Sequence, residues 1–305
     1  MRERFVAVHW RDLGPYVESL RAMERAIEYP IEDGEDAFCI DHGSEYHPFF
    51  TTLGDAWFIL GLEGDRVVAN MVGIRRAAIL RGERRSAIYL ADMKVARDRR
   101  GGGLARRMVQ WGFLKMLRDP AMRFWRYAYL AAMRGARGDV MRTVRGAHPG
   151  KLVLPAARLA VYFVAPEKLA ALRVEGAPPA PSETTGIDLS ARPRHLEPPG
   201  LLSTAGRKDL RLRSTGAHWP LVHLPLGPGE WKPTWGAYLS ECGKALVARS
   251  GSATACFGID ARLSDHIAWL SRQQIEPGAT CTVYAFSLSL RSRGAKWLHL
   301  ATSEI

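Results

Sequence analysis

This sequence of 305 residues has few cysteines and no long hydrophobic run. Its four cysteines show no C-x-x-C spacing, which argues against a zinc site and a disulfide framework, and we expect no metal site. No segment approaches the ~20 apolar residues that a membrane span needs. The N-terminus lacks the apolar run of a signal peptide. We therefore expect a cytoplasmic protein without a membrane span.

Lysine is also scarce, since only 8 of the 43 basic residues are Lys, a bias that codon composition explains. The charge is unevenly distributed along the chain. Residues 1–65 carry 5 basic and 14 acidic side chains, a net charge of −9. Residues 66–151 carry 21 and 5, a net charge of +16, and residues 152–305 carry 17 and 12, a net charge of +5. The formal net charge of +12 therefore comes from the middle segment, which predicts an anionic partner there.

The hydrophobic pattern of the first half predicts alternating helices and strands. Asp12 is the expected N-cap of a helix over 13–29, in which apolar residues recur at the i, i+3, i+4 spacing of one buried face. Further along, the pattern predicts strands at 56–63, 67–74 and 86–95, a helix at 104–117 and a strand at 124–133.

The composition changes near residue 177, where APPAPSETTG is rich in Pro, Ser and Thr. Such a stretch is typical of a linker. We therefore predict two domains, residues 1–175 and 205–305, joined by a Pro-rich linker at 176–204. In the second domain the pattern predicts strands at 244–250, 253–259, 281–290 and 296–302, and a helix at 264–274.

The most informative segment is AIYLADMKVARDRRGGGLARRMVQW, residues 87–111. In it, an apolar strand runs into RGGGLA at 100–105, which opens an amphipathic helix. A glycine-rich turn at a helix N-terminus lets unpaired backbone N–H groups face one anion, and the helix dipole adds positive charge. Arginines on both sides of the glycines add full charges. The segment therefore predicts a phosphate-binding loop, but it has neither the Gly-Lys-Ser/Thr of a P-loop nor G-x-G-x-x-G.

Residues 100–105 fit the pattern R-x-x-G-x-G/A, and they resemble the pyrophosphate loop of the GNAT superfamily of acyl-CoA-dependent N-acyltransferases. The preceding Asp92-Met93-Lys94-Val95 resembles the fourth strand of that family. The element order of residues 5 to about 133 is similar as well. The resemblance implies a mixed α/β fold, with a mostly antiparallel sheet flanked by helices. The strand-rich second domain would be either a degenerate GNAT-like half, as in tandem members, or an unrelated small domain.

The resemblance also implies a binding site for acetyl-CoA or a longer-chain acyl-CoA. Backbone N–H groups of the glycine loop would bind the pyrophosphate. Backbone groups of the strand end would pair with the pantetheine arm and polarise the thioester carbonyl. The implied binding residues are Met93, Lys94, Val95, Arg100, Gly101, Gly102, Gly103, Leu104 and Ala105.

Two residues are candidates for acid–base catalysis. Asp92 lies eight residues before Arg100, where the family often has a carboxylate, and it would remove the amine proton or else pair with a nearby Arg. Tyr162 is the first choice for protonating the leaving thiolate, with Tyr127 and Tyr129 as alternatives. The sequence departs from the family here, since Met-Arg-Gly at 133–135 replaces the expected Asn and the Tyr-x-x-x-Gly-Phe signature is absent.

Four other ring side chains, one His and three Trp, are further candidates for a binding site. His148 lies in the loop GAHPG, where a solvated turn is the simpler interpretation. Trp219, Trp231 and Trp235 stand among Pro and Gly, where they would line an acyl or peptide groove or would simply pack.

The leading hypothesis is an N-acyltransferase that transfers an acyl group to a primary amine. The acceptor would be cationic, such as a lysine- or ornithine-type side chain, free or in a peptide, because residues 1–65 would form an acidic rim. One alternative is a protein that binds tRNA or another nucleic acid through the +16 segment. The other is a non-catalytic acyl-CoA sensor.

Overall fold

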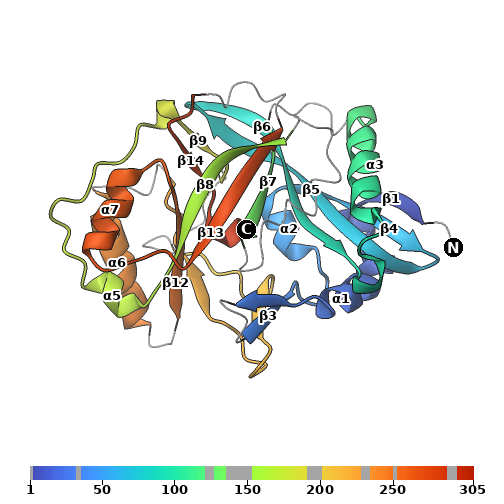
Figure 1. Ribbon diagram of the computed structural model, residues 1–305, viewed down its shortest axis with the longest axis horizontal. Coiled ribbons are helices and arrows are strands. Elements are labelled where there is room, and N and C mark those ends of the chain that lie inside the picture. The colour runs from blue at the N-terminus through green and yellow to red at the C-terminus, as the bar shows by residue number, and fades with distance from the viewer. Residues whose placement is uncertain are drawn as a thin grey trace.

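The computed structural model describes residues 3–31, 36–120, 127–134, 153–190, 201–227, 234–249, 253–286 and 294–305. An 11-stranded sheet crosses the whole molecule (Figure 1). Its main path has the order β1-β4-β5-β6-β7-β13-β8-β12-β11, and β9 and β14 join it at β5. The strands on this main path are β1 (Arg4–His9), β4 (Asp55–Glu63), β5 (Arg66–Leu80), β6 (Glu83–Val95), β7 (Tyr127–Arg134), β8 (Val153–Val164), β11 (Leu221–His223), β12 (Thr254–Asp260) and β13 (Ala279–Phe286).

Most neighbours in this sheet are antiparallel, but β6 and β7 are parallel, as are β11 and β12. The two added strands are β9 (Gly186–Asp188) and β14 (Trp297–His299), which pair in parallel. A separate three-stranded sheet combines β2 (Tyr29–Ile31), β3 (Asp36–Asp41) and β10 (Asp209–Leu212), so that strands from both halves of the chain meet.

Helices cover both faces of the first half of the sheet. Helix α1 (Val17–Arg25) and α2 (Pro48–Leu53) contact β5 on one side, and α3 (Leu104–Arg118) crosses β1, β4, β5 and β6 on the other (Figure 1). Gly112 lets α3 approach closely, because an added Cβ there would lie 2.6 Å from the Cδ1 atom of Ile59. The remaining helices α5 (Pro166–Ala170), α6 (Trp235–Ala248) and α7 (Ser264–Arg272) belong to the second half.

Two sequence predictions of secondary structure are wrong. The helix predicted over 13–29 is α1 preceded by two 3-10 turns, and Asp12 makes no capping hydrogen bond. Pro15 favours the tight turn before α1, and Tyr29, which precedes a proline, is extended in β2. The strand predicted at 244–250 is the end of α6, because a short apolar run fits a buried helix as well as a strand.

The two parts of the chain share one sheet. Strand β13 lies between β7 and β8, and Figure 1 shows it crossing the centre of the molecule. Within the predicted linker, β9 pairs with β5 and β14 and is buried. The division into domains at 176–204 stays a prediction, and the continuous sheet means that the second part completes the first. Among the described residues, no helix is both long and apolar enough to cross a membrane.

Candidate functional site

The glycine loop joins β6 to α3 through the 3-10 turn Arg97–Arg99. Gly101 and Gly103 have φ angles of +87° and +71°, a conformation that side chains with a Cβ rarely adopt. Gly103 is the N-cap of α3 and has no side chain to accept from the first-turn N–H groups. The three glycines are exposed, and buried Leu104 fixes the helix to the sheet. The structure thus brings the predicted loop residues together at an open helix N-terminus.

The arginines beside this loop differ in what they already bind. Arg99 pairs with Glu63, Arg66 with Asp98, and Arg107 with Glu3. Arg100 donates to the backbone oxygen of Val95 at 3.2 Å. Arg100 and Arg106 are exposed and form no ion pair within the described ranges of the chain. These two guanidinium groups therefore remain available to an anion at the glycines.

Strand β6 separates from β7 before it ends. The two strands pair only from Ala87 to Leu90, whereas β6 continues to Val95 along β5. A β-bulge at Asp92 and Met93 faces β5, and Asp92 has a φ angle of +52°. Among the described residues, no strand pairs with the β7-facing edge of β6 beyond Leu90, which leaves this edge to an extended ligand. Two carbonyl oxygens of this segment already accept from side chains, that of Asp92 from Asn70 and that of Val95 from Arg100. The side chains packed there are apolar, namely Met93, Leu130, Ala132, Val153 and Tyr284.

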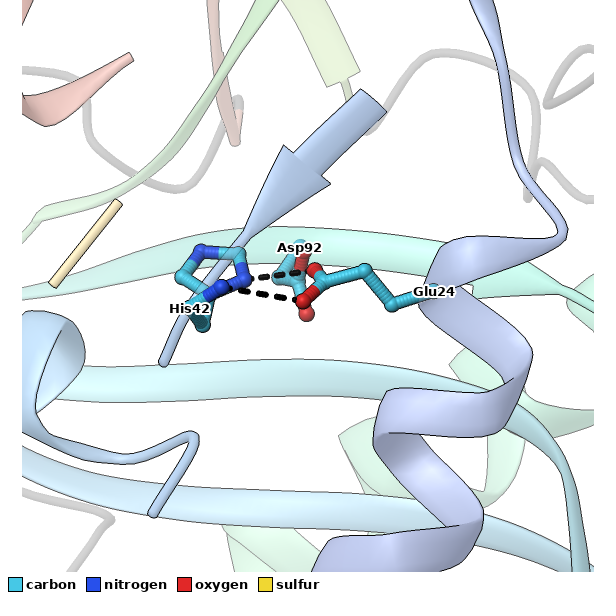
Figure 2. Close-up of side chains that lie close together, drawn as sticks. All are labelled: Glu24, His42 and Asp92. Atoms are coloured by element: carbon cyan, nitrogen blue, oxygen red, sulfur yellow. Dashed lines mark hydrogen bonds and ion pairs between the residues drawn. The ribbon is translucent and has the colours of Figure 1, made fainter. Parts of the chain in front are cut away.

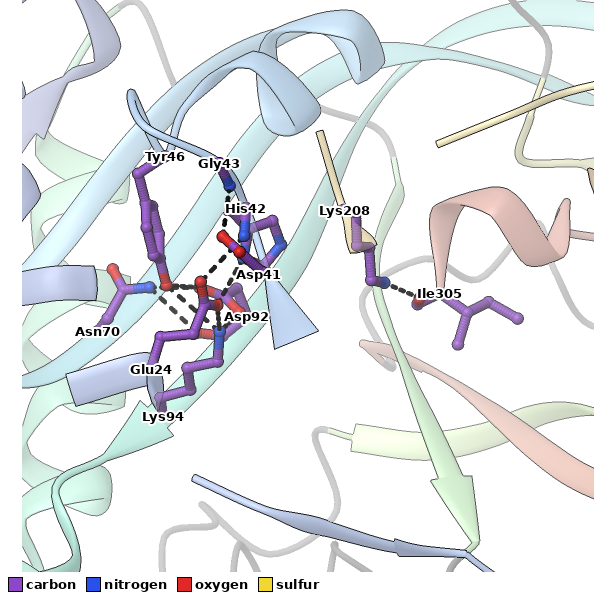
Figure 3. Close-up of polar contacts among 10 residues, drawn as sticks. All are labelled: Glu24, Asp41, His42, Gly43, Tyr46, Asn70, Asp92, Lys94, Lys208 and Ile305. Carbon is purple, nitrogen blue, oxygen red and sulfur yellow. Dashed lines mark hydrogen bonds and ion pairs between the residues drawn. The ribbon is translucent and has the colours of Figure 1, made fainter. Parts of the chain in front are cut away.

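A buried polar cluster occupies the face of β6 beneath α1 (Figure 3). Asp92 accepts from the hydroxyl of Tyr46 at 2.7 Å and from the amide of Asn70 at 2.7 Å, and it lies 2.6 Å from the ammonium of Lys94. Lys94 also donates to Glu24, which comes from α1. The side chains of Lys94, Glu24 and Asp92 are 2%, 3% and 6% exposed, so these charges neutralise one another without water.

His42 completes this cluster. Its Nδ1 lies 2.6 Å from one carboxylate oxygen of Glu24, and its backbone N–H donates to the other at 3.0 Å. Burial alone would raise the pKa of Glu24, but three effects lower it to about 2: the hydrogen bond from His42, the charge that His42 carries once it is protonated at low pH, and the ammonium of Lys94. Burial, helped by the charge of Lys94, lowers the pKa of His42 below 6.5. The cluster at neutral pH therefore combines two carboxylates, one ammonium and a neutral imidazole.

Burial opposes the positive charge of Lys94, but Asp92 and Glu24 outweigh it and raise the pKa of this ammonium. The Glu24, His42 and Asp92 ligand atoms lie within 4.8 Å of one another, close enough to hold a metal ion by distance alone. Lys94 contacts both carboxylates, so the cation between them is the protein's own ammonium.

A second lysine approaches from the other half of the chain (Figure 3). Lys208 precedes β10, donates to the backbone oxygen of Ile305, and lies with its Nζ 4.8 Å from the ring centroid of Phe49. Burial lowers the pKa of Lys208 to about 8. The ring centroids of His42 and Phe49 are 5.4 Å apart, so His42 and Lys208 both lie against the Phe49 side chain.

The structure separates the two predicted acid–base residues. Asp92 belongs to the cluster, next to the bulge, whereas Tyr162 is buried in a second apolar core and stacks on Phe257 at 5.0 Å. Burial raises the pKa of Tyr162 to about 12, and its hydroxyl has no hydrogen-bond partner among the described residues. Tyr127 and Tyr129 are buried beside Tyr89 in the main core. The assignment of Tyr162 as the acid stays a prediction.

The structure describes two of the four other ring side chains that the sequence singled out. Trp219 is half-buried and stacks on Phe163 at 5.5 Å, and Trp235 is buried against Trp269. His148 and Trp231 lie outside the described residues.

Sequence reasoning missed Glu24, His42, Tyr46 and Lys208. Glu24 stands on the polar face of the predicted helix, where an exposed position is the ordinary expectation, yet it is 3% exposed. His42, Tyr46 and Lys208 lie in segments with no regular periodicity. A buried lysine predicted on an apolar strand was the one available signal, because Lys94 needs a carboxylate partner.

No protein-family model and no curated protein sequence matches this chain. Its structure is similar to that of N-myristoyltransferase from Saccharomyces cerevisiae with bound myristoyl-CoA, at 12% identity and a TM-score of 0.50, covering 93% of this chain and 78% of that one. It is also similar to a tandem GNAT protein from the clavulanic acid biosynthesis pathway, at 11% identity and a TM-score of 0.51, covering 93% of this chain and 98% of that one. The predicted GNAT-type fold is therefore confirmed, and the similarity extends over both halves.

Proposed function

We propose that this chain is an acyl-CoA-dependent N-acyltransferase. One observation carries the proposal: in the described part of the chain no strand pairs with the β7-facing edge of β6 from Ala91 to Val95, and β6 leads into an open glycine-rich N-terminus of α3. The first feature suits an extended amide-containing arm, and the second suits the pyrophosphate at the end of that arm. Coenzyme A has both groups in this order.

In this proposal the backbone N–H groups of Gly101, Gly102, Gly103 and Ala105 bind the pyrophosphate. Arg100 adds a charge-assisted contact, since its guanidinium is exposed and pairs with no carboxylate among the described residues. Leu104 is buried and acts through its position, anchoring the helix whose N-terminus faces the anion.

The backbone of Met93, Lys94 and Val95 would pair with the pantetheine arm and polarise the thioester carbonyl. Fixed N–H groups in such a place stabilise the oxyanion of the tetrahedral intermediate without reorganising. The Lys94 side chain takes no part in this pairing and instead neutralises Asp92 and Glu24 in the buried cluster. The donor would be acetyl-CoA or a longer-chain acyl-CoA, and the apolar side chains between β6 and β7 are compatible with either.

The acceptor in this proposal is a primary amine, free or in a peptide, of cationic character. The −9 charge of residues 1–65 supports this character, and the structure reduces that support. Several of the acidic residues in that segment are ion-paired with basic residues, namely Glu3, Glu18, Glu24, Glu28, Asp41 and Glu63. Fewer acidic side chains of this segment are therefore left to attract a cationic amine.

Nucleic-acid binding gains no support from the described part of the chain. Many basic residues of the +16 segment are already paired with acidic ones, including Arg66, Arg76, Arg85, Lys94, Arg99 and Arg107. A steep salt dependence of tRNA binding would restore that alternative.

The test is calorimetric titration of acetyl-CoA and myristoyl-CoA into the wild-type protein and into Gly103→Glu. The added carboxylate would stand at the pyrophosphate position, and we expect the dissociation constant to rise at least 30-fold. Gly176→Glu is the matched control, because Gly176 has a φ angle of +70° and open space around it and belongs to the second half, where the adjacent Glu175 accepts from Trp269 of α7. Equal affinity of wild-type and Gly103→Glu protein for both donors would refute the proposed loop. Binding of acyl-CoA without release of the thiol in the presence of any amine would instead indicate a non-catalytic acyl-CoA sensor.

A further inference from the structure

The imidazole of His42 is held in one orientation by Glu24 (Figure 2). The 2.6 Å contact joins Nδ1 to a carboxylate oxygen, which only accepts hydrogen bonds, so Nδ1 carries the ring proton. Nε2 consequently presents a lone pair. Figure 2 shows this second nitrogen on the side of the ring away from both carboxylates. A carboxylate that fixes the tautomer of a histidine in this way leaves Nε2 ready to accept a proton.

Nε2 has no hydrogen-bond partner among the residues that the structure describes. It is not one of the fully buried side-chain atoms without a partner, so this nitrogen keeps some contact with solvent, although His42 as a whole is only 2% exposed. A free lone pair that solvent can reach is open to a proton donor that is not part of the chain.

The other proton acceptors of the cluster are engaged. One oxygen of Asp92 accepts from Tyr46 and Asn70, and the other faces Lys94. The oxygens of Glu24 accept from Lys94 and from two N–H groups of His42. Either carboxylate would have to break two or more hydrogen bonds before it took a proton. His42 has to break none.

We infer that His42 is the general base of the acyl transfer and that Glu24 is its positioning residue. This inference rests on the proposed function. One ring nitrogen of His42 lies within 4.8 Å of an Asp92 oxygen, and Asp92 is at the bulge where the thioester would be polarised. Nδ1 faces the carboxylates, and Nε2 lies on the other side of the same ring. In this inference the attacking amine approaches Nε2 from that side, directly or through one water.

The proposed step is balanced in atoms and charge. The nitrogen of the neutral amine forms a bond to the thioester carbonyl carbon, and the carbon–sulfur bond then breaks with its electron pair on sulfur. The proton that the nitrogen loses passes to Nε2 of His42, which returns it to the leaving thiolate. The products are an amide and the thiol of coenzyme A, and His42 is neutral again.

The charges around His42 suit this role. Glu24 faces it from α1, Asp92 and Lys94 from β6, and Tyr46 from the same loop, while Lys208 shares its contact with Phe49. Burial and Lys94 lower the pKa of His42, while Glu24 and Asp92 counteract them in part. The imidazole is therefore neutral at pH 7, and activity should fall as the pH drops below 6.5.

The experiment measures release of the coenzyme A thiol from acetyl-CoA and myristoyl-CoA, with water alone and with L-lysine, L-ornithine, spermidine or a short peptide with a free N-terminus. His42→Asn keeps an N–H donor for Glu24 but removes the base. We expect thiol release to fall at least 100-fold with acyl-CoA affinity unchanged within twofold. Imidazole should restore part of the rate to His42→Ala. His9→Asn is the control, since His9 also bonds a carboxylate, that of Asp55 at 2.9 Å.

Glu24→Gln separates positioning from simple support of the fold. The glutamine oxygen still accepts from Nδ1, but the negative charge that raises the pKa of His42 is gone. We expect about a tenfold lower rate and an acidic limb of the pH profile that shifts to lower pH. A purely structural role would lower the amount of active protein and leave that limb in place.

The outcomes distinguish the inference from the proposed function. A His42→Asn variant that keeps its rate within threefold, or that loses acyl-CoA affinity, overturns the role of His42 while acyl transfer by the wild-type protein stands. A wild-type protein that binds no acyl-CoA, or binds it without any turnover, overturns the proposed function and with it this inference.

Discussion

Two positively charged side chains, Lys94 on β6 and Arg100 in the loop that follows, lie six residues apart in the sequence but differ in their surroundings. Lys94 is enclosed by Asp92 and Glu24 with 2% of its side chain exposed. Arg100 is exposed, and in the described part of the chain its hydrogen-bond partner is a backbone oxygen. A charge compensated inside the protein supports the fold, whereas a charge left uncompensated at an open helix N-terminus is available to a ligand.

This comparison also explains why the +16 of residues 66–151 overstates the positive surface. Part of that charge is buried against carboxylates, as in the pair of Arg76 with Glu304, whose side chains are 2% and 0% exposed. Part is paired at the surface, as in Arg99 with Glu63. Part forms no ion pair among the described residues, and beside the glycine loop this part includes Arg100 and Arg106.

The largest expected effect follows from removing the buried charge. Lys94→Met leaves two buried carboxylates without their ammonium, and we expect the free energy of unfolding to fall by about 3–5 kcal/mol. Arg66→Met is the control, because the Arg66–Asp98 pair is about half exposed on both sides. Its loss should cost at most about 1 kcal/mol. Urea denaturation of both variants measures the difference, and equal losses would remove the distinction between buried and exposed charge.

The glycine loop and the buried cluster also differ in how well the sequence predicts them. The loop is local: one stretch of 25 residues contains the strand, the glycines, the arginines and the helix, and all of them lie where expected. The cluster is assembled from α1, a loop, β5 and β6, which are separated by up to 70 residues. Periodicity reports which face of an element is buried, but it does not report which buried polar residues meet.

The same limit applies to the second half of the chain. Its strand-rich character is visible in the sequence, but the insertion of β13 between β7 and β8 is a long-range pairing with no local signal. The apolar residues Ala245, Leu246 and Val247 fit a strand as well as a helix. These residues form the end of α6, because the helix buries Leu246 with Leu239 and Cys242 on one face.

A smaller effect should appear in the pH dependence of stability. The pKa of Glu24 is lowered from 4.5 to about 2 in the folded protein, so the folded state binds fewer protons than the unfolded state between these values. Its contribution is therefore complete above about pH 5 and is lost as the pH falls. Between pH 5 and pH 3 we expect the wild-type protein to lose about 2 kcal/mol more stability than Glu24→Gln. Denaturation curves at both pH values measure this, and parallel losses in the two proteins would contradict it.

The smallest effect concerns the exposed charge, and it should affect binding and leave the fold unchanged. Arg100→Ala removes a guanidinium that adjoins Gly101 in the chain and has no acidic partner among the described residues, and we expect the dissociation constant of acyl-CoA to rise about tenfold, or ~1.4 kcal/mol. Stability should stay within about 0.5 kcal/mol. Because the contact is exposed, raising the salt concentration should weaken wild-type binding more than binding by the variant.

Arg85→Ala provides the matched control for this last measurement. Arg85 lies on the same strand, β6, but near its beginning, and it pairs with Glu83. We expect it to bind acyl-CoA as the wild-type protein does, with the same salt dependence. If Arg85→Ala weakened binding as much as Arg100→Ala, the affinity would depend on the overall charge of the segment. The difference between the two variants therefore measures how much of the +16 acts locally at the loop.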